Sequence, residues 1–208
     1  RDSVRSGLES VEKCSNEEER NHFLHLMSEE TVHMKRLIDD MLLLANSDAD
    51  TLTIKPEACQ PDLLLLDTYE KFEPLAKKNG LHLILTLPEE ILPDCFCDIH
   101  RTEQIFSIIV DNALCYTPSG GKVTLSCHAE NEMLCFLFED TGCGISEEKK
   151  SHIFERFYRA DDAHTDREHF GLGLCIAKEL TEKQNGNIQV VDAPISGSCF
   201  MVQLPCAL

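Results

Sequence analysis

The stretch FEDTGCGIS, from Phe138 to Ser146, ends an apolar run that begins at Met133. A run of this length and composition is typical of a buried strand. Two carboxylates, Glu139 and Asp140, stand at its end, and two glycines one residue apart follow them. Taken alone, the glycines favour a turn. A ligand-binding interpretation therefore depends on whether other parts of the chain supply matching chemistry.

Composition limits the classes of function. The chain has 208 residues, of which 42% are hydrophobic, so it can form one domain with an appendage or two small domains. Its formal net charge of −18 argues against nucleic-acid binding, which depends on Lys and Arg that neutralise phosphates. No purely apolar run, Leu63 to Leu66 included, is long enough to span a bilayer, and no signal peptide opens the chain. We therefore expect a soluble fragment that makes no membrane contact.

The cysteines favour a reducing compartment. There are 11 of them, scattered without a Cys-x-x-Cys pair and mostly inside apolar segments. This pattern is typical of buried, reduced thiols in a cytoplasmic protein. Cys95 and Cys97 are separated by one residue and could bind a metal. Because their neighbours resemble a short strand and no other close pair supports a site, the sequence favours a structural role for both.

Residues 1–50 predict a helical hairpin. Asn16, followed by three glutamates, is a favourable N-cap for a long second helix. An apolar stripe recurs along that helix at spacings of three, four and seven, at Phe23, Met27, Met34, Leu37, Ile38, Met41 and Leu44. A matching stripe lies on a shorter first helix, at Val4, Leu8 and Val11. The hairpin packs either on its own domain or, as we expect, in a dimeric four-helix bundle with a second copy.

Residues 51–208 predict a separate domain of mixed secondary structure. Helices are expected at 61–78, 101–115 and 172–184, with strands at 51–54, 81–87, 95–98, 122–129, 133–139, 187–191 and 198–204. The strands at 122–129 and 133–139 are predicted to form a hairpin. The fold class is therefore α+β: a two-layer α/β sandwich with helices on one face of a mixed sheet, preceded by the helical hairpin.

Three further stretches carry polar or glycine-rich patterns. RTEQIFSIIVDNALCYTPSGGKV, residues 101–123, is a predicted helix that ends in Tyr-Thr-Pro and a Gly-Gly turn. IFERFYRAD, residues 153–161, combines aromatic and basic side chains. FGLGLCIAKEL, residues 170–180, opens a helix with Gly171 and Gly173. The first two have ordinary structural explanations, whereas glycines at a helix N-terminus leave backbone N–H groups bare and favour phosphate binding.

The chemistry of these stretches is mutually consistent. The amide oxygen of Asn112 suits Mg²⁺, which prefers hard oxygen ligands and keeps phosphates and waters in its shell. The carboxylate of Asp140 can accept a hydrogen bond from the exocyclic amine of adenine, whereas guanine offers an acceptor there. Glycine beyond Asp140 lets the backbone approach a ring closely.

In this order, the four stretches resemble the N, G1, F and G2 boxes of sensor histidine kinases, whose catalytic domain is related to those of gyrase, the Hsp90 chaperones and MutL. The resemblance covers about residues 52–205. It extends upstream, because residues 27–57 resemble the second helix of the family's dimerisation and phosphoacceptor hairpin. The resemblance implies a partial hairpin at residues 1–50 and an ATP-binding catalytic domain at residues 51–208.

The resemblance also implies roles for individual residues. Asn112 is expected at the Mg-ATP site as a Mg²⁺ ligand, and Asp140 is expected to bind adenine. The remaining expected ATP-binding residues shape the base pocket, flank the nucleotide or hold its phosphates: Tyr116, Gly142, Gly144, Arg159, Gly171, Gly173 and Ser198. Residues 157–170 are expected to form a mobile lid over ATP.

The chain departs from the family pattern at several positions. Ile108 replaces an Asn that is frequent four residues before the N-box Asn, Cys115 replaces a Lys, and Glu168-His169 replaces a Gly-Gly pair. None of the nine histidines precedes an acid in the way the phosphoacceptor His does. By the family's spacing, that His would lie about three turns of helix before Arg1. The alternative is that the protein lacks it.

The resemblance implies transfer of the ATP γ-phosphoryl to a His on the dimerisation helix, followed by relay to an Asp of a response regulator. The expected partners are a second copy and a receiver domain, the expected location is cytoplasmic, and the whole protein is expected to be membrane-anchored. The departures favour one rival, a degenerate nucleotide-binding switch or scaffold without kinase activity. A second rival, an anti-sigma-factor-type serine kinase, is disfavoured by the long hairpin.

Overall fold

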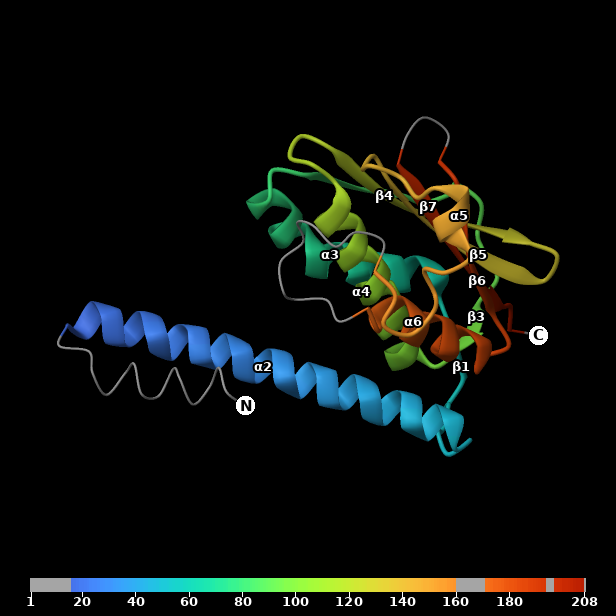
Figure 1. Ribbon diagram of the computed structural model, residues 1–208. Helices are drawn as coiled ribbons and strands as arrows, with labels where there is room; N and C mark the ends of the chain where they lie inside the picture. Colours follow the sequence, from blue (N-terminus) through green and yellow to red (C-terminus); the bar gives the residue numbers. More distant parts are fainter. Residues whose placement is uncertain (1–15, 160–170, 194–196, 208) are drawn as a thin grey trace. The chain divides into compact units, whose positions relative to one another are not determined.

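The computed structural model describes residues 16–159, 171–193 and 197–207 of the chain (Figure 1). The chain divides into two compact units, Arg1–Asp50 and Thr51–Leu208. In the first unit, the described residues form one helix, α2 (Glu17–Asp48). The side chain of Asn16 accepts a 3.1 Å hydrogen bond from the backbone N–H of Glu18, as expected of an N-cap. The shorter helix predicted before Asn16 lies outside the described residues.

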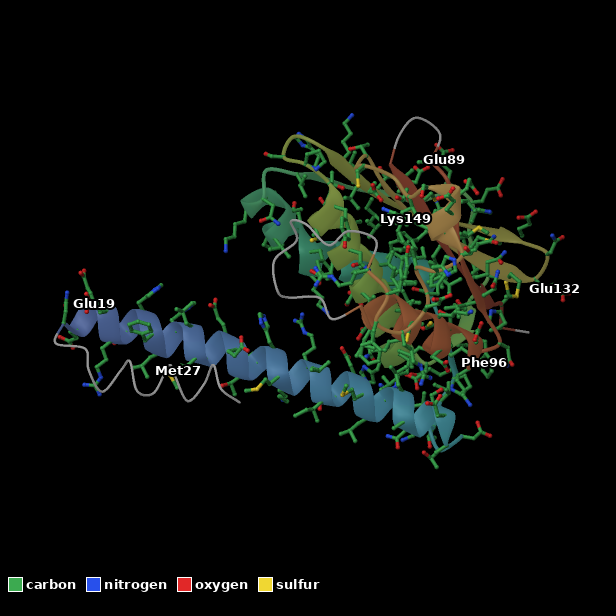
Figure 2. All side chains as sticks on the ribbon, in the orientation of Figure 1. Glu19, Met27, Glu89, Phe96, Glu132 and Lys149 are labelled. Atoms are coloured by element: carbon green, nitrogen blue, oxygen red, sulfur yellow. The ribbon has the colours of Figure 1, made fainter. Side chains whose placement is uncertain are left out.

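Helix α2 carries apolar side chains as well as charged ones, as Figure 2 shows for Met27 and Glu19. Among the described residues, Val32, Ile38 and Leu42 are each 56% exposed, although they are large and apolar. Exposed apolar side chains on a long helix are available to a further helix. Within the part of the chain that the structure describes, no helix is long and apolar enough to span a bilayer.

The second unit is built on a five-stranded mixed sheet with the strand order β2-β4-β5-β7-β6. Its strands are β2 (His82–Thr86), β4 (Lys122–Glu130), β5 (Met133–Asp140), β6 (Asn187–Asp192) and β7 (Ser198–Pro205). Strands β2 and β4 are parallel, and every other pair is antiparallel. The predicted hairpin between β4 and β5 is confirmed, and Asn131 and Glu132 turn it with positive φ angles of 50° and 64°.

Three helices cover one face of this sheet (Figure 1): α3 (Pro61–Lys78), α4 (Ile99–Tyr116) and α6 (Gly173–Glu182). The predicted two-layer α+β fold is therefore confirmed. Phe106 of α4 is fully buried, and its ring centroid lies 4.9 Å from that of Phe136 and 5.0 Å from that of Phe138. These aromatic contacts fix α4 against β5. They thereby set the C-terminal half of α4 beside the end of β5, where Asp140 lies.

The strand predicted at residues 51–54 is wrong. The structure instead forms β1 (Glu57–Cys59), which pairs antiparallel with β3 (Cys95–Cys97) in a separate two-stranded sheet. The alternating Thr and Ile residues at 51–54 have strand propensity, but a strand also needs a partner whose backbone can accept and donate hydrogen bonds. That partner is β3, and it pairs with the residues a few positions further along the chain.

Candidate functional site

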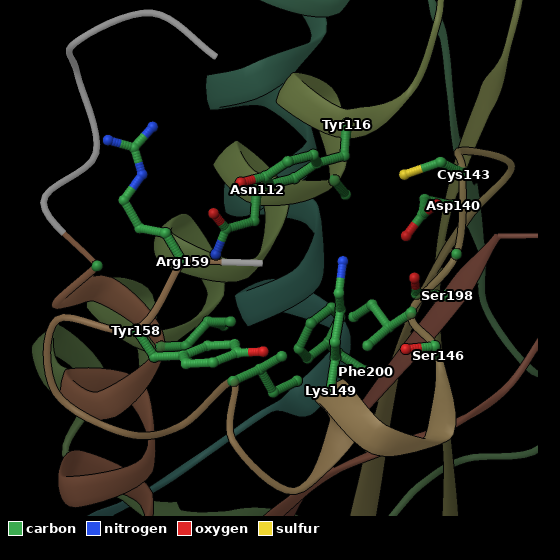
Figure 3. Close-up of a pocket in the computed structure, with 16 residues that line it drawn as sticks. Asn112, Tyr116, Asp140, Cys143, Ser146, Lys149, Tyr158, Arg159, Ser198 and Phe200 are labelled. Carbon is green, nitrogen blue, oxygen red and sulfur yellow. The ribbon is translucent and has the colours of Figure 1, made fainter. Parts of the chain in front are cut away.

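A cavity of about 360 Å³ lies among α4, α5 (Glu147–Lys150), the end of β5 and the start of β7 (Figure 3). This volume suits a small-molecule ligand. Residues from all four sequence stretches, which are far apart along the chain, line it. Of the predicted site residues, those that line the cavity are Asn112, Tyr116, Asp140, Gly144, Arg159, Gly171 and Ser198.

The other two predicted residues, Gly142 and Gly173, do not line the cavity but adjoin residues that do. The backbone N–H of Gly142 donates a 2.8 Å hydrogen bond to Oδ1 of Asp140. Gly173 is the first residue of α6. Each glycine therefore supports a residue or an element that does line the cavity.

Asp140 is the last residue of β5 and is only 5% exposed. Burial raises the pKa of its carboxyl group, and hydrogen bonds from the backbone of Gly142 and from the backbone and side chain of Ser198 oppose that rise. A charge taken out of water needs such donors. The carboxylate is therefore held in one orientation, as a directional acceptor in a largely dry part of the cavity.

Two glycines hold Asp140 by leaving no room for a side chain. A Cβ on Gly142 would lie 2.4 Å from the carbonyl oxygen of Tyr116. A Cβ on Gly197 would lie 1.9 Å from the carbonyl oxygen of Asp140, and Gly197 also has a φ of +91°. Strand ends from β5 and β7 can approach this closely only where Cβ is absent. Gly142 was predicted from the sequence, whereas Gly197 was not.

The opposite end of the cavity carries longer polar side chains. Asn112, half-buried on α4, and Arg159 lie across the cavity from Asp140 and Ser198 (Figure 3). Tyr116 lies between the two ends, one turn after Asn112 on the same helix. The cavity thus has an anionic, enclosed end and an end that carries an amide and a guanidinium group.

The start of α6 forms part of this polar end. Gly171 has a φ of +73°, and a Cβ there would lie 2.8 Å from the carbonyl oxygen of Tyr158. The backbone N–H of Phe157 donates a 2.9 Å hydrogen bond to the carbonyl oxygen of Gly171. This bond joins Phe157, at which the predicted lid begins, to Gly171, which directly follows the lid. Residues 160–170 of the lid lie outside the described part of the chain. Leu172, the N-cap of α6, makes no side-chain capping bond, so the first N–H groups of the helix are not capped by that side chain.

Residues 97–208 match the family described as histidine kinase-, DNA gyrase B- and HSP90-like ATPases. The chain belongs to this ATPase family. A curated relative is the adaptive-response sensory kinase SasA of Rippkaea orientalis, 32% identical over 187 residues, which are 89% of this chain and 47% of SasA. The chain therefore spans less than half the length of that relative.

Solved structures of histidine kinases share the fold. Full-length ShkA in complex with AMPPNP is 24% identical with a TM-score of 0.79, and the match covers 99% of this chain and 43% of ShkA. ThkA in complex with the response regulator TrrA is 18% identical with a TM-score of 0.75, over 98% of this chain and 57% of ThkA. At these identities the matches show a shared fold.

Several residues of the ATPase-family cavity were missed by sequence reasoning. Lys149, half-buried on α5, extends its amine into the cavity in Figure 3. In the sequence it sits in a run of charges, Glu147 to Lys150, which has the pattern of a solvated helix face. Cys143 was given no role but is exposed at the cavity wall. Apolar side chains that also line the cavity are Ile145, Ile153, Leu174 and Phe200.

The departures from the family pattern have distinct structural settings. A Cβ on Gly173 would lie 3.2 Å from Cγ2 of Ile108, so Ile108 packs directly against the start of α6. Cys115 is exposed at the end of α4. Glu168 and His169 lie outside the described residues. The Ile108 side chain therefore fills space between two helices and supplies no polar atom to the cavity.

Proposed function

We propose that this chain is the ATP-binding catalytic region of a sensor histidine kinase. The observation that carries the proposal is the two-ended cavity, with a buried carboxylate at Asp140 and cationic side chains, Lys149 and Arg159, elsewhere on its wall. An adenine base matches the first end, and a polyphosphate matches the cations. Membership of the ATPase family and the AMPPNP in the ShkA structure give independent support.

Adenine recognition rests on Asp140. Its carboxylate accepts a hydrogen bond from the exocyclic amine of adenine, whereas guanine would place an oxygen acceptor against it. An acceptor that faces a buried carboxylate loses its hydrogen bond to water and gains none, which is costly. Apolar side chains such as Phe200 and Ile145 cover the ring faces. The site should therefore bind ATP in preference to GTP.

Phosphate binding rests on the start of α6, where the N-cap Leu172 supplies no capping side chain, and on Arg159 and Lys149. Bare N–H groups at a helix N-terminus, joined to the positive end of the helix dipole, suit phosphate oxygens. Asn112 is the residue whose amide oxygen would hold Mg²⁺, and the ion would neutralise charge on the phosphates. One amide oxygen is compatible with Mg²⁺, because this ion usually keeps several waters and phosphate oxygens as ligands.

The chemical step is transfer of the γ-phosphoryl group to an imidazole nitrogen. A P–N bond forms as the bond between the γ-phosphorus and the bridging oxygen breaks, and ADP leaves with the electron pair. The residues of this chain orient ATP and stabilise charge on the transferring group, which is how phosphoryl-transfer enzymes act in general. The proposal places the acceptor His upstream of Arg1, on a dimerisation helix.

The proposed partners follow from the same role. The exposed apolar side chains of α2 are available for a homodimer, in which two hairpins form a four-helix bundle. A response regulator receiver domain would accept the phosphoryl group on an Asp, and the ThkA structure contains such a regulator, TrrA. The proposed location is cytoplasmic, in a protein anchored to a membrane.

The rival function is a nucleotide-binding switch or scaffold without kinase activity. Ile108 favours it, because this side chain packs against Gly173 and offers no oxygen to a metal. Cys115 also favours it, since it places a thiol where the family carries a Lys. Both functions predict ATP binding. They differ in whether the phosphoryl group is transferred.

Labelled ATP distinguishes the two functions. A form of the protein extended upstream of Arg1 would be incubated with Mg²⁺ and ATP labelled at the γ-phosphate. The kinase predicts label on the protein that is stable in base and lost in acid, as a phosphoramidate is. ATP binding without label would support the switch, and absence of ATP binding would reject both functions. Replacement of each upstream His by Gln identifies the acceptor.

A further inference from the structure

A cluster of three cysteines lies away from the cavity, on the two-stranded sheet of β1 and β3. Cys59 of β1 is directly opposite Cys95 of β3, and Cys97 follows two residues later on the same face of β3. Phe96, between them, points to the other face, where it is 44% exposed and visible at the surface in Figure 2. The pairing of β1 with β3 thus brings together three thiols that are up to 38 residues apart in sequence.

The distances among the three sulfur atoms fit a single bound ion. The sulfur atoms of Cys59 and Cys97 are 3.4 Å apart, and all three lie within 4.8 Å of one another. Three sulfurs bound to one thiophilic ion at about 2.3 Å would be separated by roughly 3.8 to 4.0 Å. The Cys59–Cys97 separation is slightly shorter than this range, and no two of the three sulfurs are farther apart than 4.8 Å. Shifts of less than about 1 Å, within the reach of side-chain rotation, would complete the geometry.

The surroundings of the cluster are closed on one side and open on the other. Cys95 and Cys97 are fully buried, whereas Cys59 is half-buried and gives access from the solvent. The acidic groups that influence the cluster are Asp94 and Asp98, and the hydroxyl of Thr102 hydrogen-bonds Cys97. Nearby carboxylates add negative potential, which favours a cation. A buried set of sulfur donors with a single point of entry is the form that structural metal sites take.

A second group of possible ligands is weaker. His128, Glu130 and Cys135 also lie within 4.8 Å of one another through their ligand atoms. His128 and Glu130 are exposed, however, and the sulfur of Cys135 lies 3.5 Å from the side-chain amide of Gln203, which donates to it. Exposed residues of this kind gather on sheet surfaces without any metal. Of these two groups among the described residues, the three-thiol cluster is the one that joins burial with a uniform set of soft ligands.

We propose that Cys59, Cys95 and Cys97 form a site for one soft metal ion of the Cu(I) or Zn(II) type. Thiolates select these ions over hard ions such as Mg²⁺. On binding, up to three thiol protons pass to the solvent as three metal–sulfur bonds form, and no electron is transferred. Zn(II) would take its fourth ligand from water at the Cys59 side, whereas Cu(I) needs none. The bound ion links β1 to β3 and stabilises the edge at which the chain enters the second unit.

The test measures metal affinity of the reduced protein under anaerobic conditions. Cu(I) and Zn(II) would each be titrated in competition with a coloured chelator. The proposal expects one equivalent of at least one ion to move from the chelator to the protein, with a rise in melting temperature. It also expects Cys59→Ser and Cys97→Ser each to weaken binding by more than about 100-fold, since loss of a direct ligand exceeds the 10- to 100-fold typical of an outer-shell residue.

A matched control removes the exposed thiols. Among the described residues, Cys115 and Cys143 are exposed, and the double variant Cys115→Ser/Cys143→Ser should bind the ion as the parent does. Loss of binding in this control, or full binding in Cys59→Ser and Cys97→Ser, would overturn the proposal. Cys59→Ser should fold normally because its side chain is half-buried, and circular dichroism without metal checks this.

A measurement on the parent protein removes any dependence on variants. X-ray absorption at the metal edge counts the sulfur neighbours of the bound ion. Three sulfurs support the site, and two or fewer overturn it, as does the failure of both ions to bind in competition with the chelator. None of these outcomes depends on the nucleotide cavity, so the kinase proposal and the metal proposal stand or fall separately.

Discussion

The two ends of the cavity are built from different kinds of structure. At the Asp140 end, backbone atoms approach so closely that two glycines have no space for a side chain: Gly142 lies against the carbonyl of Tyr116 at the end of α4, and Gly197 lies against the carbonyl of Asp140. Elsewhere on the cavity wall, long side chains such as Lys149 and Arg159 reach in from separate elements. Positions fixed by backbone contacts tolerate no added atom, whereas long side chains can be shortened without moving the fold. We therefore expect mutations at the two ends to have different consequences.

The largest effect is expected for Gly197→Ala. Its Cβ would lie 1.9 Å from the carbonyl oxygen of Asp140, and its φ is +91°. The clash and the strained backbone together should lower the free energy of unfolding by about 3 to 5 kcal/mol. Urea unfolding measures this loss.

Gly120→Ala is the matched control for Gly197→Ala. Gly120 has a similar φ of +85°, but a Cβ there would meet nothing within 4 Å. This variant should therefore lose only about 1 to 2 kcal/mol, the cost of the backbone conformation alone. Equal losses in the two variants would show that the close approach of β7 to Asp140 does not constrain the fold.

Asp140→Asn should have the next largest effect, on binding and not on folding. The amide keeps the shape of the carboxylate but loses its charge and one acceptor oxygen. Charged hydrogen bonds are worth about 1.5 to 3 kcal/mol, so ATP affinity should fall roughly 10- to 100-fold, and the preference for ATP over GTP should shrink. Isothermal titration measures both. Glu139→Gln, at the neighbouring carboxylate, should leave affinity unchanged, and an unchanged affinity in Asp140→Asn would reject the adenine assignment.

Local patterns predicted most of the elements and the enclosed end of the cavity. The helix at Pro61–Lys78 follows from Pro at its start and Asn79-Gly80 at its end, and the β4–β5 hairpin follows from two strand patterns separated by a short turn. Asp140 and Gly142 were found because only one residue separates them in sequence. Signals of this kind depend on neighbours along the chain.

The features that the sequence did not predict depend on residues brought together by the fold. Gly197 is constrained by Asp140, which is far away in sequence, and nothing near Gly197 indicates that contact. Lys149 has the pattern of a surface charge until α5 places it at the cavity. The Cys95 and Cys97 pair had no visible third ligand, because the pairing of β1 with β3 supplies Cys59. The strand predicted at 51–54 was wrong for the same reason: β3 pairs with Glu57–Cys59, and the strand propensity of residues 51–54 gives no sign of that pairing.

The enclosed end should also respond to acid. Burial raises the pKa of Asp140, so the folded protein holds this proton at pH values where the unfolded chain has lost it. The contribution of Asp140 to stability is therefore greatest in acid and falls as pH rises from the ordinary carboxyl pKa through the raised one. Adenosine affinity should instead be weakest in acid, because protonation of Asp140 removes the charged acceptor. Below the raised pKa, the affinity should fall by up to about tenfold for each unit by which the pH is lowered. Asp140→Asn should abolish this pH dependence, which titrations at a series of pH values would show.

The smallest effect is expected for Lys149→Ala. Lys149 is a half-buried residue whose amine points into the cavity, and as a cation it should interact with the phosphates and not with the base. A partly exposed charge interaction is worth up to about 1 kcal/mol, which corresponds to a loss of about fivefold in ATP affinity with adenosine affinity unchanged. Lys150→Ala is the control, because this lysine is also half-buried on the same short helix but pairs with Glu147 and does not line the cavity. An equal loss in both variants would mean that the net charge of α5, and not the position of one amine, sets the affinity. A loss of adenosine affinity in Lys149→Ala would instead place this lysine beside the base, and the division of the cavity into two ends would have to be redrawn.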